Sequence, residues 1–171
     1  MLKKAGIVLS MLMVLSLGIV PVALAADSGT VNITAQGDNQ EIAITVTPPS
    51  HDFGVLVAST VNPSGLDAFI LTNTGNVVVN TTIAGENMTG TGVPWVLAGE
   101  DEGPAADRYA LDAGLSSGTA FDIEVTTVAA DLALGLLAAD IQGFGLQISA
   151  PTSFTDSDVK SGDVTIAAVI P

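Results

Sequence analysis

The sequence contains no cysteine and only one histidine, His51. Disulfides therefore cannot stabilise the fold, and a structural zinc site lacks its usual ligands. Nucleophilic catalysis needs a nucleophile beside a base, yet His51 follows a Pro-Pro turn and no serine lies in a G-x-S-x-G motif. Carboxylate pairs that cleave sugars usually sit beside aromatic platforms, and the chain has one Trp and one Tyr. The sequence therefore predicts a protein that is not an enzyme.

Basic residues are also scarce, with four Lys and Arg against 18 Asp and Glu. Two of the four, Lys3 and Lys4, stand at the N-terminus, and all the acidic residues follow Ala25. Binding to nucleic acid depends on Lys and Arg that displace counterions from phosphates. The charge therefore excludes nucleic acid and anionic lipid as natural partners, and it favours solubility outside the cell.

The N-terminal segment has the order of a secretory signal peptide. Lys3 and Lys4 precede an apolar run over residues 5–20, and Pro21 then leads to the small residues of Ala23-Leu24-Ala25. A transmembrane anchor is the alternative, but the run is only about as long as the shortest spanning helices. We expect cleavage after Ala25, which leaves residues 26–171 as one secreted domain at the cell surface, with no membrane anchor and with a flexible segment over residues 26–40.

Many short segments alternate apolar and polar residues, as half-buried strands do. They cover residues 30–35, 41–47, 120–128 and 163–170, with shorter apolar runs at 55–57, 95–97 and 145–149. Residues 69–83 contain the turn sequence Thr72-Asn73-Thr74-Gly75-Asn76 and predict a hairpin. Residues 129–139 leave two alternatives open, one short helix or a strand end and a loop, because Gly135 interrupts the segment. The pattern predicts an all-β fold, a single antiparallel β-sandwich of immunoglobulin-like or jelly-roll topology.

Several of these segments resemble immunoglobulin-like β-sandwich domains of secreted bacterial and archaeal cell-surface proteins. The resemblance rests on His51-Asp52-Phe53-Gly54, on the segment from Phe69 to Asn76, and on Val79 and Ile83. These motifs describe strands and turns and carry no chemistry. In the same interpretation Phe53 enters the core, Gly54 lets the chain bend, and Trp95 beside Pro94 serves core packing.

Two acidic clusters offer oxygen ligands that Ca²⁺ prefers in flexible loops. The first consists of Glu100, Asp101, Glu102 and Asp107, and the second of Asp156, Asp158 and Asp163. Neither matches the spacing of an EF-hand. The alternative is a pair of solvated loops.

A secreted domain without an anchor must associate to remain at the cell surface. Residues 30–35 alternate, with Val31 and Ile33 on one face, and could add as a strand to the sheet of a neighbour. An ordinary strand within its own domain is the alternative. We expect a self-assembling structural subunit of an extracellular filament or envelope layer, which associates with itself or with other envelope proteins. A monomeric binding or adhesion module, stabilised by calcium, is the alternative.

Overall fold

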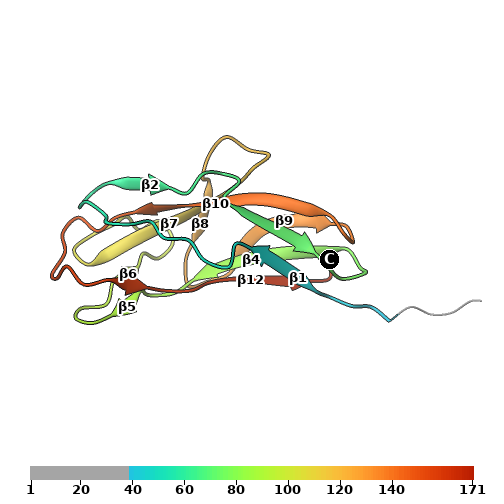
Figure 1. Cartoon of the computed structure of the whole chain (residues 1–171), viewed down its shortest axis with the longest axis horizontal. Coiled ribbons are helices and arrows are strands. Elements are labelled where there is room, and N and C mark those ends of the chain that lie inside the picture. Colours follow the sequence, from blue (N-terminus) through green and yellow to red (C-terminus); the bar gives the residue numbers. More distant parts are fainter. Residues whose placement is uncertain (1–38) are drawn as a thin grey trace, which may run out of the picture. The chain divides into compact units, whose positions relative to one another are not determined.

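The computed structural model describes residues 39–171, and every helix or strand assigned within that range is a β-strand (Figure 1). The strands are β1 (Ile44–Thr47), β2 (Val61–Pro63), β3 (Phe69–Asn73), β4 (Val79–Gly85), β5 (Thr89–Gly90), β6 (Val96–Leu97), β7 (Arg108–Leu115), β8 (Ile123–Val125), β9 (Ala130–Leu136), β10 (Ile141–Ser149), β11 (Lys160–Ser161) and β12 (Val164–Val169). The predicted all-β class is confirmed. The predicted signal segment 1–25 and the strand predicted at residues 30–35 lie outside the described residues.

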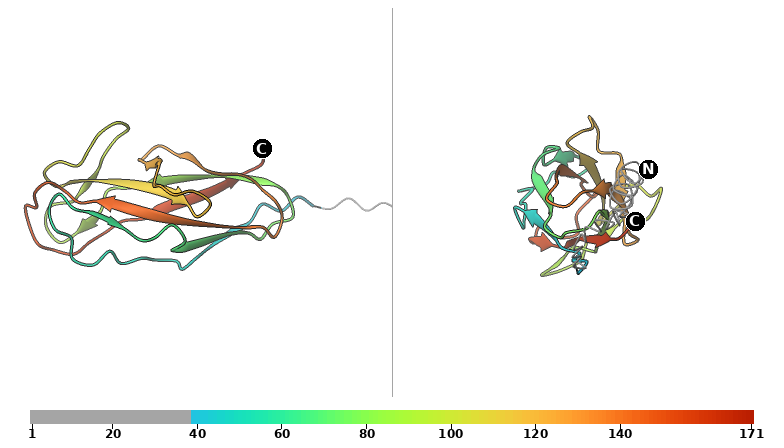
Figure 2. Two further views of the ribbon diagram at one scale, coloured as in Figure 1. Left: turned by 90° about the horizontal axis from the view of Figure 1, so that it is seen from above. Right: turned by 90° about the vertical axis from the view of Figure 1, so that its right-hand side faces the viewer.

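Three sheets form from these strands. The largest has the order β1-β3-β10-β7-β6, with β2 also paired to β10 and β8 also paired to β7. A second sheet has the order β12-β4-β9, and β11 and β5 form a short ribbon. Figure 2 shows that the large sheet curls, so that the strands surround a common interior in a sandwich-like arrangement. The pairings are antiparallel except for β6 with β7, which is parallel and departs from the purely antiparallel expectation.

Alternation within the central strands creates the core between the sheets. Burial in β3 and β4 follows a period of two, as expected when one face of a strand is covered. The side chains of Leu71 in β3 and Ile83 in β4 have no exposed surface. Strand β7 contributes Tyr109, Leu111 and Ala113 from the same face. Full burial of a side chain as large as Leu or Ile stabilises the fold by about 1.5–3 kcal/mol.

The hairpin predicted at residues 69–83 is wrong, because β3 and β4 belong to different sheets. The buried Asn73 amide donates to the carbonyls of Val77 (2.8 Å) and Leu136 (2.9 Å), and thereby fixes a crossover. The turn then pairs with the segment before β1, where the amides of Thr74 and Gly75 donate to the carbonyl of Ala43. The connection lies at residues 74–78, later than the predicted turn, because Thr72 and Asn73 belong to β3. It joins two layers rather than two neighbouring strands of one sheet.

Two further segments differ from expectation. Residues 129–139 contain the whole of β9, in place of the short helix or the strand end and loop that were expected. The strand tolerates Gly135 at φ 68° beside register shifts in its pairing with β4. Residues 55–57 form no strand, and Val55 is 99% exposed. Within residues 39–171 there is no helix long and apolar enough to cross a membrane.

Candidate functional site

Two strand edges lie open on the same side of the fold. Strand β1 ends the large sheet and pairs only with β3, whereas β12 ends the second sheet and pairs only with β4. The inward side chains of β1 and β12 stay partly exposed, in contrast to the covered core strands beside them. Among the described residues, no strand closes the gap between these two edges.

An apolar cavity of about 1450 Å³ fills this gap. One wall is β1 with the following residues 48–56, and the other is the segment 154–166 that leads into β12. We call this cavity the groove. Cavities that bind small molecules usually measure about 300–1,000 Å³, so the groove has room for a larger occupant.

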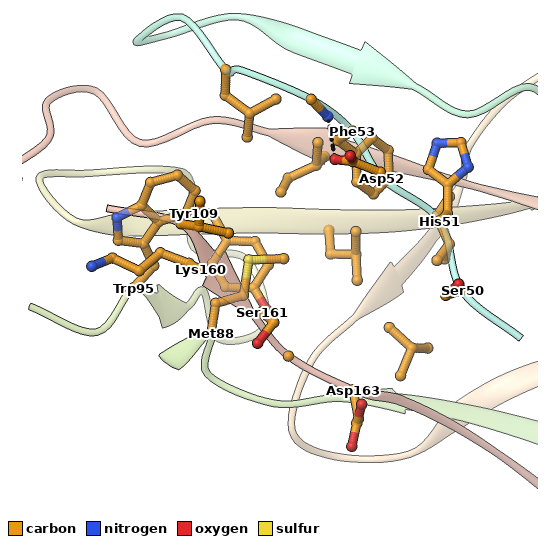
Figure 3. A pocket seen from close by; sticks show the side chains of 18 of the residues that line it. Ser50, His51, Asp52, Phe53, Met88, Trp95, Tyr109, Lys160, Ser161 and Asp163 are labelled. Carbon is orange, nitrogen blue, oxygen red and sulfur yellow. Dashed lines mark hydrogen bonds between the residues drawn. The ribbon is translucent and has the colours of Figure 1, made fainter. Parts of the chain in front are cut away.

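The aromatic residues of the chain gather in this groove. Of the five Phe, one Tyr and one Trp in the sequence, only Phe121 lies elsewhere. The six in the groove are Phe53, Phe69, Trp95, Tyr109, Phe144 and Phe154 (Figure 3 labels three of them). Aromatic side chains dominate interface energetics because each buries a large area. Aromatic residues, which are scarce in the sequence, are therefore concentrated around the groove.

One end of the groove is built around Trp95. Its ring stacks on Phe154 with centroids 5.0 Å apart, and its backbone exchanges two 2.9 Å hydrogen bonds with Met88. Trp95 packs against the core, as predicted. Its indole nitrogen is buried, with no hydrogen-bond partner among residues 39–171. Such a group costs about 1–3 kcal/mol when it stays unpaired.

The opposite part of the groove wall follows Pro48 and Pro49. His51 meets Phe53 and Phe69 edge-on, with ring centroids 4.6 and 5.9 Å apart. Phe53 is half-buried and packs against the core, as predicted. The Asp52 carboxylate accepts a 2.7 Å hydrogen bond from the amide of Gly54, which adopts φ 69°. Gly54 thus bends the chain, in a loop rather than in a strand.

The tyrosine on the groove floor is fixed by its hydroxyl group. Tyr109 donates a 2.5 Å hydrogen bond to the carbonyl of Glu86. Burial, and to a smaller extent the charge of Glu86, raises the pKa of Tyr109 far above its ordinary value. The phenol therefore stays neutral at any physiological pH and acts as a packing group with one satisfied donor.

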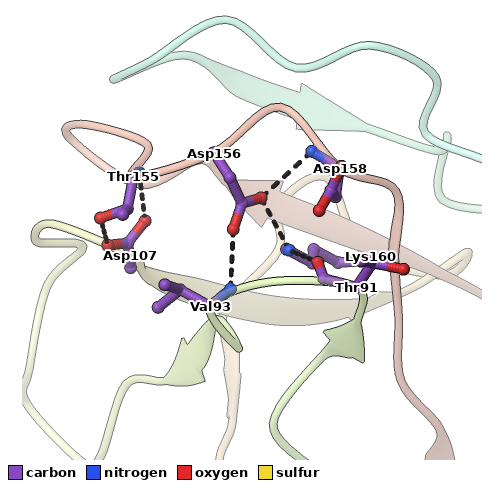
Figure 4. Close-up of polar contacts among 7 residues, drawn as sticks. All are labelled: Thr91, Val93, Asp107, Thr155, Asp156, Asp158 and Lys160. Atoms are coloured by element: carbon purple, nitrogen blue, oxygen red, sulfur yellow. Dashed lines mark hydrogen bonds and ion pairs between the residues drawn. The ribbon is translucent and has the colours of Figure 1, made fainter.

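A polar clamp holds the wall that leads to β12 (Figure 4). The Lys160 side chain is 1% exposed, and its ammonium contacts the Asp156 carboxylate at 2.7 Å and the Thr91 carbonyl at 2.6 Å. The same carboxylate accepts hydrogen bonds from the amides of Val93 (2.7 Å) and Asp158 (3.1 Å). These contacts, that of Lys160 first, lower the pKa of Asp156. The clamp fixes one end of the groove to the loop after β5.

Two of the four carboxylates predicted to bind calcium, those of Glu102 and Asp107, contact other partners. Glu102 pairs with Arg108 (3.2 Å) and accepts from the amide of Gly99 (3.0 Å). Asp107 accepts hydrogen bonds from the amide (2.8 Å) and the hydroxyl group of Thr155. Glu100 lies apart, beside a smaller cavity of about 370 Å³. No three acidic or histidine side chains within residues 39–171 come together as a metal-binding group, and calcium binding stays a prediction.

The remaining member of the first acidic cluster is held by its backbone, since the amide of Asp101 donates to the Glu124 carboxylate at 3.2 Å. In the second cluster, the Asp163 amide donates to the Glu86 carboxylate at 3.0 Å. The predicted strand-donor residues Val31 and Ile33 lie outside the described residues.

Sequence patterns did not reveal the groove. Its floor depends on β7, whose alternation of Tyr109, Leu111 and Ala113 with Arg108 and Asp112 is visible in the sequence and would have predicted a strand. The open side depends on which strands end the sheets, and no local pattern encodes that. Comparison with known proteins adds nothing here, since no family model, curated protein or solved structure gives a significant match.

Proposed function

We propose that the domain is a β-sandwich of immunoglobulin-like or jelly-roll type in which one strand position, between β1 and β12, is left open. The support is that the inward faces of both edges border an apolar cavity that reaches the core. An unpaired strand edge is a template for another chain. An apolar cavity bordered by two such edges has the form of an acceptor for an added strand.

On this basis the protein is a structural subunit of an extracellular filament or envelope layer, which assembles by strand addition. The observation that carries the proposal is the concentration of six of the seven aromatic residues in one open groove. Three of these six, Phe69, Tyr109 and Phe144, belong to the buried core, so a strand added in the groove would pack directly against the core. A contact between two different surfaces of the same chain generates an open polymer unless its rotation closes a ring.

Export supports the same function. The signal-peptide pattern of residues 1–25 directs the domain out of the cytoplasm, and an acidic surface suits a protein that must stay soluble until it assembles. The candidate donor is the alternating segment 30–35, with Val31 and Ile33 on one face.

The experiment compares four charge substitutions in the secreted protein, examined by electron microscopy. We expect V31D and I33D to abolish assembly, because a charge on the apolar face cannot enter the groove without a large desolvation cost. The matched controls N32D and T34D add the same charge on the opposite face and should assemble normally. Deletion of residues 26–36 should reproduce the loss, and unchanged assembly of that deletion variant would rule out strand addition through this segment.

A second function is favoured by the same aromatic lining, namely a monomeric binding or adhesion module that takes an apolar ligand into the groove. Size-exclusion chromatography over a range of protein concentrations separates the two functions, because a monomer elutes independently of concentration. Parallel runs with calcium and with a chelator test the predicted calcium dependence at Glu100, Asp101, Glu102 and Asp107. A concentration-independent monomer under both conditions would favour the module.

A further inference from the structure

The groove has two edges, and the pattern of backbone hydrogen bonds shows which groups each edge offers. Along an antiparallel strand, successive residues direct their N–H and C=O groups to opposite sides. The Gly85 amide of β4 donates to Thr126, on the side away from β12. Its neighbour Ala84 therefore faces β12, where its register partner is Thr165. Thr165 therefore directs its backbone N–H and C=O groups toward β4. The backbone groups of the alternate residues Val164, Ile166 and Ala168 point away from β4, toward the open edge.

The same reasoning applies to β1. The Ala43 carbonyl accepts from Thr74, so Thr45 and Thr47 also face β3. The outward groups are those of Ile44 and Val46. Beyond them comes Pro48, which has no N–H group to donate. The edge of β1 is therefore short and ends at a proline, whereas β12 offers three outward residues in an unbroken run.

The residues that offer free backbone groups also point their side chains toward the groove. Val164 and Ile166 of β12 both line it, and both are half-buried. In an antiparallel pair, residues directly opposite each other project to the same face. A strand added to β12 therefore forms main-chain hydrogen bonds through those residues that also enter the groove.

The direction of the added strand differs between a donor from a second copy and a donor from the same copy. In Figure 1, β12 ends and β1 begins on the right-hand side, and residues 39–43 run away from the groove on that side. This stretch is held there, because Glu41 exchanges hydrogen bonds of 2.7 and 3.1 Å with Asn76. We call residues 30–35 the arm. To reach the groove of its own copy, the arm would need to reverse direction within residues 36–38, and it would then run antiparallel to β1. An arm from a neighbour in line enters from the Trp95 end without reversal, and it runs antiparallel to β12.

Length and side-chain size fix the register. The wall from Lys160 to Ile166 is seven residues long, about 23 Å at 3.3 Å per extended residue, and residues 30–35 span about 20 Å on the same scale. We place the small residue Ala35 beside Gly162, where a Cβ built on the glycine would lie 3.1 Å from Met88 and space is therefore limited. Val31 and Ile33 then fall beside Ile166 and Val164, where the groove lies.

We propose that residues 30–35 of a second copy add antiparallel to β12 and become the fourth strand of the β12-β4-β9 sheet, with Val31 beside Ile166 and Ile33 beside Val164. This inference rests on the proposed function and specifies its acceptor edge, direction and register. The occupant is a second copy of this chain.

The absence of native cysteine permits a direct test by disulfide trapping. The double variant I33C/V164C is assembled in full-length secreted form, oxidised and run on a non-reducing gel. Opposed residues of paired strands satisfy the Cα separation of a disulfide, so we expect a ladder of covalent multimers that collapses on reduction. V31C/I166C should give the same ladder. I33C/A168C, which is four residues out of register, should give at least tenfold less cross-linked product.

The alternatives give different results. A ladder from I33C/V46C, in place of I33C/V164C, would place the arm on β1 and overturn the choice of edge. An oxidised monomer, with no ladder, would show that the arm folds back on its own copy. If none of these pairs cross-links while V31D still abolishes assembly, the acceptor edge and register are wrong but strand addition stands. If V31D and the deletion variant assemble normally, the proposed function fails as well.

Discussion

The crossover at Asn73 can be tested by one substitution, because a single buried side chain connects the two layers that border the groove. The variant N73A removes two donated hydrogen bonds, to Val77 and Leu136, and one accepted from the amide of Gly75 (3.0 Å). Asn73 has no exposed surface, and the contact with Leu136 is buried. An orphaned buried group costs about 1–3 kcal/mol, and each of the two more accessible bonds contributes roughly 0.5–1.5 kcal/mol.

The expected loss of unfolding free energy is therefore about 2–6 kcal/mol. At the middle of that range, the melting temperature of a domain of this size decreases by roughly 8–16 °C. Urea unfolding can be followed by the fluorescence of Trp95, the only tryptophan, with the slope of the transition as a check on two-state behaviour.

The matched control is N62A, which removes one partly buried hydrogen bond, between Asn62 and Thr60 (2.9 Å). It should change the stability by less than about 1 kcal/mol. An N73A variant that differs from the parent by no more than the control would show that water satisfies the freed backbone groups. In that case Asn73 would not hold the crossover.

Three other substitutions test separate contacts. Burial, and then the charge of Glu124 directly opposite on β8, raises the pKa of Asp112. The stability that this group contributes is present at low pH and is lost as the pH rises through the raised pKa. In urea titrations, D112N should therefore be more stable than the parent at pH 7 and equal to it near pH 3. K160M should destabilise the fold, since it removes the ammonium that contacts the Asp156 carboxylate and the Thr91 carbonyl, and faster hydrogen exchange at residues 156–160 would locate the effect. G145A should cost about 1–3 kcal/mol through overpacking, because a Cβ there would lie 1.8 Å from a backbone oxygen of the β2–β3 connection; G103A, with nothing within 4 Å of the new atom, is its control. Equal melting temperatures for these two glycine variants would contradict the packing argument.

Local patterns in the sequence predicted the strand class well and the partners of strands poorly. Alternation over residues 163–170 and 41–47 corresponds to β12 and to β1, because each strand has one covered face. The same rule, applied to residues 69–83, gave a hairpin, since a turn sequence does not state whether the next strand stays in the sheet. Asn73 decides that through a contact with Leu136, 63 residues away in the chain.

The candidate site shows the same limit. The acidic residues were visible as clusters, yet Glu102 pairs with Arg108, six residues away, and Asp107 accepts from Thr155, 48 residues away. Counted along the chain, the single Trp and the single Tyr indicated no aromatic platform. Folding brings Phe53, Trp95 and Phe154 to one place, and only tertiary structure can show that.

The two unlike edges of the groove have a consequence for growth. If copies join as proposed, a row of them has polarity, with an empty receptacle (the groove) at one terminus and an unused tail (residues 30–35) at the other. A copy without residues 26–36 keeps its receptacle but has no tail. It would bind the unused tail at the second terminus and stop further addition there. Length would then respond to the ratio of truncated to intact copies rather than to total concentration.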